Sequence, residues 1–90
     1  MRVKETKGDD ADALALAALG WILADGARAQ RLLALTGLSP EDLRERLDEP
    51  ALLASILGFL EAYEPDLLAC AEALGVKPSR LVEARRSLES

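Results

Sequence analysis

The sequence predicts an all-α protein, with six short-to-medium helices in two three-helix units that form one compact bundle. Half of the residues are hydrophobic but only 3% are aromatic, so leucine and alanine must build the core. These two residues rank highest in helix propensity. All four prolines stand where a helix is expected to start, a position that tolerates their missing N–H. The chain also contains an internal repeat, which divides the helices into two groups of three.

Residues 10–47 and 48–85 align as two copies of one unit. Ten of the 38 aligned positions are identical, against roughly four expected by chance in a chain so rich in leucine and alanine. Repeats of this length are typically supersecondary units that bury a hydrophobic face against a neighbour. We therefore expect the two units to be related by an approximate two-fold.

The first unit opens with a long helix. Residues 1–8 are polar and aperiodic, so we expect a frayed or disordered N-terminus before a single domain over residues 9–90. The aspartates from Asp9 onward predict the cap and acidic first turn of a helix that runs to about Ala24. Asp25-Gly26 predicts a break, after which a second helix begins.

Glycine and a capping motif mark the next boundary. Gly37 predicts the end of the second helix, because glycine readily adopts the left-handed conformation that closes helices. Ser39 then predicts an N-cap, Pro40 the first helical position, and Asp42 the acid of a capping box. This third helix is expected to end near Leu47.

The second unit repeats this plan. Glu49-Pro50, Glu64-Pro65 and Lys77-Pro78 open its three helices, and Gly75 ends the second of them. The first helix of each unit is apolar nearly all round, which indicates a central position wrapped by the other four helices. Small residues recur along each of them and predict a seam of close packing, in which the two long helices approach each other or a symmetry mate at Gly20 and Gly58. Trp21 and Phe59 should then fill equivalent core positions. The two stripes are Ala13, Ala17, Gly20 and Ala24 in one helix, and Ala51, Ser55, Gly58 and Ala62 in the other.

Composition favours a cytoplasmic protein that does not bind a membrane. The single cysteine cannot form an internal disulfide, and no signal-peptide pattern is visible before Asp12. The longest apolar run, residues 13–24, is too short to span a bilayer. The net charge of −5 disfavours general binding to nucleic acids or anionic membranes, both of which require excess lysine and arginine.

The residues argue against an enzyme. The chain has no histidine, no ligand spacing suited to zinc and no phosphate-binding glycine loop, so no cofactor or metal is expected. Cys70 lies on an apolar face without an activating partner, and we interpret it as a buried, inert thiol. An acidic patch is predicted on the third helix, where capping and solvation explain it better than a divalent-cation site: Glu41, Asp42, Glu45 and Asp48.

Helix–turn–helix DNA binding is the alternative. In each unit a glycine ends one helix and a leucine follows six residues later in the next, at Leu43 and Leu81. The last helix carries the basic residues that DNA binding would need: Lys77, Arg80, Arg85 and Arg86. The third helix is acidic and would be repelled by phosphates.

The favoured function is therefore a protein-interaction or regulatory module. The acidic and basic patches could guide docking or self-association. Homodimerisation through an uncovered leucine and alanine face is also expected, because two nearly all-apolar helices are hard to cover in a domain of this size. The partner's identity does not follow from the sequence.

Three segments resemble a family of small bacterial proteins known only as a domain of unknown function. They are Leu32 to Arg44, which includes Thr36-Gly37-Leu38-Ser39-Pro40, and the segments 57–60 and 67–71. The resemblance extends over residues 10–88. It implies an all-helical bacterial cytoplasmic protein, and it assigns no catalytic or binding residue.

Overall fold

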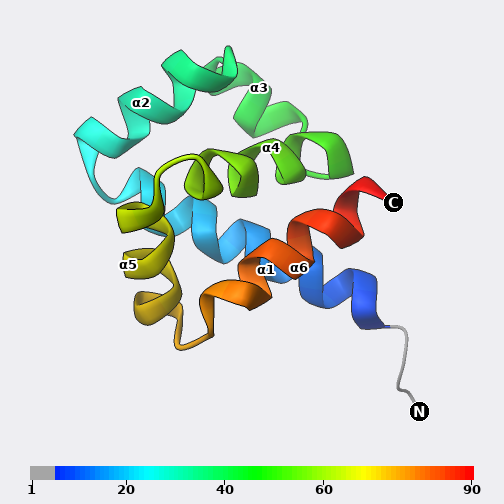
Figure 1. Ribbon diagram of the computed structural model, residues 1–90. Coiled ribbons are helices and arrows are strands. Elements are labelled where there is room, and N and C mark those ends of the chain that lie inside the picture. The colour runs from blue at the N-terminus through cyan, green and yellow to red at the C-terminus, as the bar shows by residue number, and fades with distance from the viewer. Residues whose placement is uncertain (1–5) are drawn as a thin grey trace.

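The structure is a computed structural model that describes the backbone of residues 6–90 and the side chains of residues 11–90. This part of the chain contains six helices and no strand, which confirms the all-α prediction (Figure 1). The helices are α1 (Thr6–Leu23), α2 (Gly26–Thr36), α3 (Pro40–Glu45), α4 (Pro50–Glu61), α5 (Glu64–Leu74) and α6 (Pro78–Glu89).

The local signals for helix ends are confirmed. Asp25 caps α2, its carboxylate accepting a hydrogen bond from the backbone N–H of Ala27 at 2.9 Å. Gly37 and Gly75 follow α2 and α5 with φ values of 76° and 73°, a conformation that costs other residues about 1–2 kcal/mol. Ser39 and Asp42 form the predicted capping box at the start of α3. Each proline lies within the first two positions of a helix.

Two boundaries differ from the expectation. Helix α1 begins at Thr6, three residues before the predicted Asp9, and the rest of the expected frayed segment, residues 1–5, lies outside the described residues. Helix α3 ends at Glu45, ahead of the predicted Leu47. Arg46 already departs from helical geometry, with a φ of −121° and a ψ of 21°. Glu49 is extended, as expected for a residue that precedes proline.

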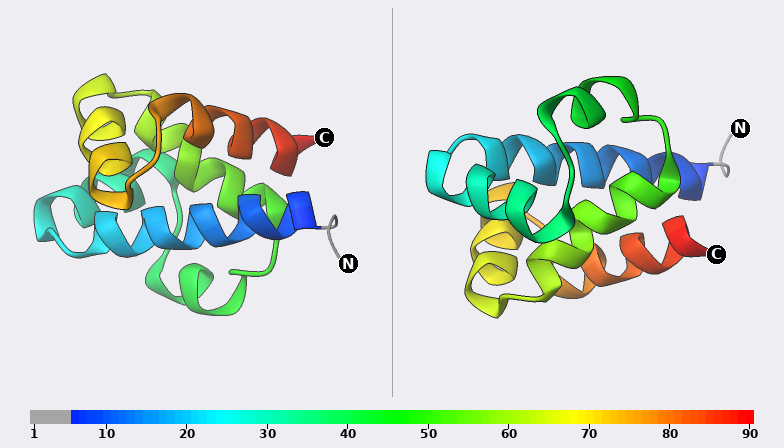
Figure 2. Two further views of the ribbon diagram at one scale, coloured as in Figure 1. Left: turned by 90° about the horizontal axis from the view of Figure 1, so that it is seen from below. Right: turned by 90° about the horizontal axis from the view of Figure 1, so that it is seen from above.

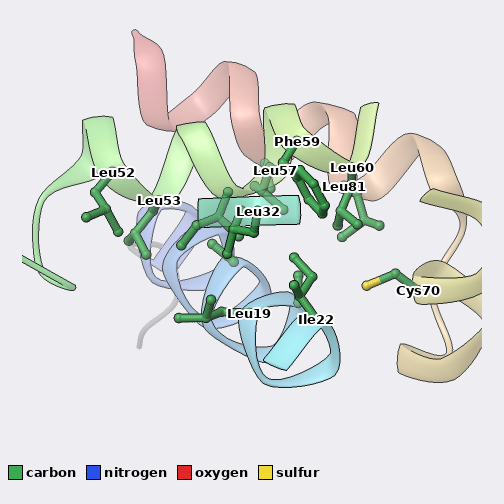
Figure 3. Close-up of a cluster of buried hydrophobic side chains, with 14 of the residues drawn as sticks. Leu19, Ile22, Leu32, Leu52, Leu53, Leu57, Phe59, Leu60, Cys70 and Leu81 are labelled. Atoms are coloured by element: carbon green, nitrogen blue, oxygen red, sulfur yellow. The ribbon is translucent and has the colours of Figure 1, made fainter. Parts of the chain in front are cut away.

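The core forms around α4. Seven of its twelve residues are buried, and Leu57 and Leu60 meet Leu19 and Ile22 of α1 in one cluster (Figure 3). Leu32 of α2 and Leu81 of α6 join the same cluster (Figure 3). Burying a leucine or isoleucine side chain contributes roughly 1.5–3 kcal/mol. Helix α4 is thus the central helix, as expected.

The third helices of the two units, α3 and α6, pack differently against the rest of the protein. Helix α6 packs along both α1 and α4, whereas α3 is a short helix with Leu43 as its single buried residue. In Figure 1, α6 crosses α1, whereas α3 lies on the far side of α4 from α1, and Figure 2 shows the same helices from below and above. The order of the helices matches the repeat, but the approximate two-fold between the units remains a prediction.

The expected packing seam between α1 and α4 is wrong, whereas close approach to a symmetry mate stays a prediction. A Cβ placed on Gly20 would meet no atom within 4 Å, and one on Gly58 would meet only the Arg85 side chain, at 3.9 Å. Phe59 is buried, but Trp21 is half-buried and therefore not its equivalent in the core. Helix α1 turns Ala15, Ala18 and Ile22 inward, so the small residues of its stripe face outward.

Candidate functional site

One side of α1 presents an uninterrupted apolar surface to solvent. From Ala13 to Ala24 the helix and the residue after it contain no charged or hydrogen-bonding side chain except the indole of Trp21. Leu16 and Leu23 are 42% and 46% exposed. We call the exposed residues of this segment the α1 face: Ala13, Leu16, Ala17, Gly20, Leu23 and Ala24. The small residues among them are those expected from the sequence to form the packing seam.

Helix α1 is exposed because too few helices are available to cover it. Its inward side is covered chiefly by α4 and α6, with α2 and α5 near one end. Helix α3, which would have to cover another side, contributes only Leu43 to the core. The α1 face is therefore left without a partner within the described chain. Contiguous exposed apolar surface of this kind usually marks a contact site for another molecule.

A second small-residue stripe lies on α4. With the end of α2 it forms a shallow groove of about 390 Å³, which we call the α4 groove: Leu35, Thr36, Ser55, Gly58, Phe59 and Ala62. Its two hydroxyl groups already donate hydrogen bonds to helix carbonyls, Thr36 to Leu32 and Ser55 to Ala51. Leu35 is 72% exposed at its rim. The groove therefore offers apolar contacts without a directed polar group.

The predicted acidic patch is exposed, except for Asp42, which is part of a cap. Glu41 and Glu45 project from the side of α3 opposite the buried Leu43, and Asp48 follows in the turn before α4. The Asp42 carboxylate accepts a hydrogen bond from the backbone N–H of Ser39 at 2.9 Å. This bond holds the pKa of Asp42 below its ordinary value; partial burial opposes the shift, and the Ser39 hydroxyl and Arg46 add to it.

The predicted basic patch is divided between two sides of α6. Arg85 ion-pairs with Glu61 of α4 and with Glu89, which lies one turn later on α6. Arg80 lies five residues earlier, about 140° away around the helix, and is 3.7 Å from Glu83. Lys77 and Arg86 are exposed at opposite ends of the helix. The four residues are thus not gathered into one surface.

Polar side chains also gather where α2 meets α1 and α5, and sequence reasoning missed this cluster. The Arg28 guanidinium stacks 3.7 Å from the centre of the Trp21 ring and donates to the Trp21 carbonyl oxygen at 2.9 Å. Arg31 donates to the Asp66 carboxylate at 2.8 Å. Arg31 and Asp66 are 35 residues apart, and the contact between Arg28 and Trp21 crosses the break between α1 and α2. Neither helical periodicity nor capping motifs could have predicted them.

Cys70 lies within this region and is buried, as predicted. Burial raises the pKa of its thiol to about 11; the nearby Arg28 opposes the rise and Asp66 adds to it. A thiol of this kind remains protonated near neutral pH, and the protonated form is a poor nucleophile.

Within residues 11–90 no group of acidic residues and Cys70 is placed to hold a metal ion. No helix of the described segment is both long enough and apolar enough to cross a membrane.

Comparisons with known proteins agree with the resemblance seen in the sequence. Residues 8–90 match the model of a family described as a protein of unknown function, DUF3572. The chain therefore belongs to this family. A search of curated proteins and a search of solved structures found no match.

Proposed function

Because the family to which the chain belongs has no known function, we propose from its surface that the protein is a protein-interaction module acting through the α1 face. The observation that carries this proposal is the exposure of Leu16 and Leu23 on a helix surface without polar side chains. A surface helix normally carries charged or polar residues on its solvent side. Placing leucines there instead is costly in water, and a protein partner would relieve that cost.

The other helices support this choice by contrast. The exposed positions of α6 are mainly charged, and α5 alternates exposed acidic and apolar residues. Only α1 is apolar over three full turns of its exposed side among the described helices. If the whole protein had an apolar surface, several helices would have apolar exposed sides. Among the described helices, an apolar exposed side of this length occurs on α1 alone.

We further propose that the module is regulatory and not an enzyme, and that it acts in the cytoplasm. The absence of histidine from the sequence and the buried, protonated Cys70 support a function without catalysis. The cytoplasmic assignment is supported by a fold whose one cysteine is a free thiol, since oxidising compartments favour disulfide-linked cysteines in small domains.

The test is comparative affinity capture from cells that contain the protein. Three baits are used: the intact protein, a Leu16→Glu/Leu23→Glu double variant, and Leu35→Glu as a matched control. Leu35 is also an exposed leucine, but it lies on α2 at the rim of the α4 groove. We expect the intact protein and the control to retain the same partners and the double variant to lose them. Equal capture by all three baits would overturn the proposal.

A further inference from the structure

We propose that the partner of the α1 face is an α-helix of another protein, which lies lengthwise along the face and turns large apolar side chains toward its small residues. This inference rests on the function proposed above and names the class of partner. Two properties of the face carry it: its lack of hydrogen-bonding groups, and the arrangement of its leucine, alanine and glycine residues.

The α1 face offers a partner almost nothing to hydrogen-bond. Its exposed side chains are those of leucine, alanine and glycine. The backbone from Ala13 to Gly20 lies inside a helix, where N–H and C=O groups bond to one another. Near the end of the helix the Gly20 carbonyl oxygen still accepts the N–H of Ala24, at 3.2 Å. A partner must therefore satisfy its own polar groups.

This requirement restricts the backbone conformation of the partner. An extended peptide or a loop laid on the face would bury N–H and C=O groups without partners, and each such group costs about 1–3 kcal/mol. A helix bonds its own backbone groups internally and buries only side chains. The α1 face therefore favours a partner that is itself helical where the two proteins touch.

The residues of the face leave room for side chains of such a helix. Successive helical residues are about 100° apart around the axis, which places Leu16 and Leu23 along one border of the face and the three alanines along the other. Gly20 lies between the borders, and a Cβ there would meet no atom within 4 Å. The middle of the face and its alanine border can thus accept large side chains from outside.

The spacing of these residues sets the spacing expected in the partner. Leu16, Gly20 and Leu23 are separated by four and then three residues, so the strip follows the helix axis. Two helices with apolar residues at this spacing pack side by side at a crossing angle of about 20°. The partner is therefore an amphipathic helix with large apolar residues at positions i, i+3, i+4 and i+7.

A second copy of α1 meets this description less well. It would bring Leu16 and Leu23 to the contact, but otherwise only alanine and glycine. The apolar area buried between two such faces is small against the roughly 800 Å² that a standard interface buries on each partner. Large side chains from a different helix would bury more area on the same face and so bind more strongly.

A membrane surface also fits less well. Helices that lie in a membrane surface are rich in lysine and arginine. Along the chain the charged residues that border the α1 face are instead Asp12 and Asp25, one at each end.

Designed peptides test the class of partner on the purified full chain. The first peptide is an amphipathic helix of about three heptads with leucine at its apolar positions. The second has the same composition, but its leucines are distributed around the helix. Binding is measured by the fluorescence anisotropy of labelled peptide. We expect the first peptide to bind and the second to bind at least about tenfold more weakly, because only the first presents a continuous apolar strip.

Variants of the chain locate the contact. Leu16→Glu/Leu23→Glu should weaken binding of the first peptide about tenfold or more, since it places charges in an apolar contact. Gly20→Leu should also weaken it about tenfold, because the new side chain occupies the room that the partner's side chains need. Leu35→Glu is the matched control on α2 and should bind as the intact chain does.

Gly20→Leu also separates close packing from general hydrophobic adhesion. The substitution adds apolar surface, so a peptide that merely adhered to exposed leucines would bind more tightly. We expect the variant to fold, because the position is open and leucine is a better helix former than glycine. Far-ultraviolet circular dichroism checks each variant, and Ala17→Leu on the same face replaces Gly20→Leu if helical content is lost.

The outcomes separate this inference from the function on which it rests. Failure of the first peptide to bind, equal binding of the two peptides, or unchanged or tighter binding by Gly20→Leu would each overturn the helical partner. So would binding to phosphatidylcholine vesicles, or a dimer in sedimentation equilibrium, that Leu16→Glu/Leu23→Glu abolishes. In each case a protein lost from the Leu16→Glu/Leu23→Glu bait would still support an interaction module. Equal capture by all three baits would overturn the module itself.

Discussion

Asp42 shows how much structure a few neighbouring residues can specify. Its carboxylate accepts the Ser39 backbone N–H, and its own backbone N–H donates to the Ser39 hydroxyl at 3.1 Å. Each bond satisfies a donor that the start of a helix would otherwise leave without a partner. The spacing of Ser39, Pro40 and Asp42 was therefore sufficient to predict where α3 begins. The contact between Arg28 and Trp21 was not predictable, because it depends on how α2 turns back onto α1.

The same carboxylate gives a prediction for pH dependence. Its folded-state pKa is lowered, chiefly by the hydrogen bond from Ser39, so the ionised group stabilises the fold above the unfolded value of about 3.9. That contribution is lost as the pH falls through the lower folded-state pKa. Asp42→Asn keeps an acceptor for the Ser39 N–H but cannot ionise. We expect its free energy of unfolding to vary less with pH below about 4 than that of the intact protein.

Urea unfolding at a series of acidic pH values measures this difference. Glu45→Gln is a suitable control, because it removes an acidic residue from the same helix that does not take part in the cap. Identical pH profiles for Asp42→Asn and the intact protein would contradict the assignment of the stabilising charge to Asp42.

At the scale of elements, α1 and α4 show where sequence patterns stop being informative. Both helices are apolar nearly all round, and both carry glycine at the matching position of the repeat. The pattern therefore predicted the same central role for both. The structure buries most of α4 but leaves one side of α1 in solvent. The composition of a helix determines how much apolar surface it has. Which neighbours cover that surface depends on the lengths of the other helices and on how they cross it.

The open surroundings of Gly20 predict that a side chain is tolerated at this position. The position is exposed and a Cβ there meets nothing within 4 Å, so alanine adds helix propensity without a clash. We expect Gly20→Ala to stabilise the monomer by up to about 1 kcal/mol. Gly37→Ala should instead destabilise by about 1–2 kcal/mol, because residue 37 has a φ of 76°.

Thermal unfolding of the two variants at low protein concentration, where self-association is negligible, gives both values. A lower melting temperature for Gly20→Ala would show that α1 does pack closely against another helix at this position. It would restore the seam that the sequence suggested.

For the whole molecule, stability should be distributed unevenly around α4. Helix α4 places Leu53, Ile56, Leu57 and Leu60 in the core with almost no exposure, whereas α3 is anchored by Leu43 alone. A helix with few buried contacts can open without unfolding the rest of the protein. The repeat predicted equivalent roles for α3 and α6, yet α6 packs along two helices and α3 is nearly peripheral. One substitution in the repeat agrees with this asymmetry: the exposed Arg44 of α3 aligns with the partly buried Val82 of α6.

Native-state hydrogen exchange tests this distribution. We expect the amides of α4 to exchange only through global unfolding and those of α3 to exchange through local opening at a much lower free energy. Leu57→Ala, at a fully buried position, should lower the protection of α4 by about 2–5 kcal/mol through loss of core packing. The protection of α3 should hardly change, because its local opening does not disrupt the core around Leu57. If α3 lost protection in parallel with α4, the two helices would unfold as one cooperative unit, and the short contact through Leu43 would be stronger than its burial indicates.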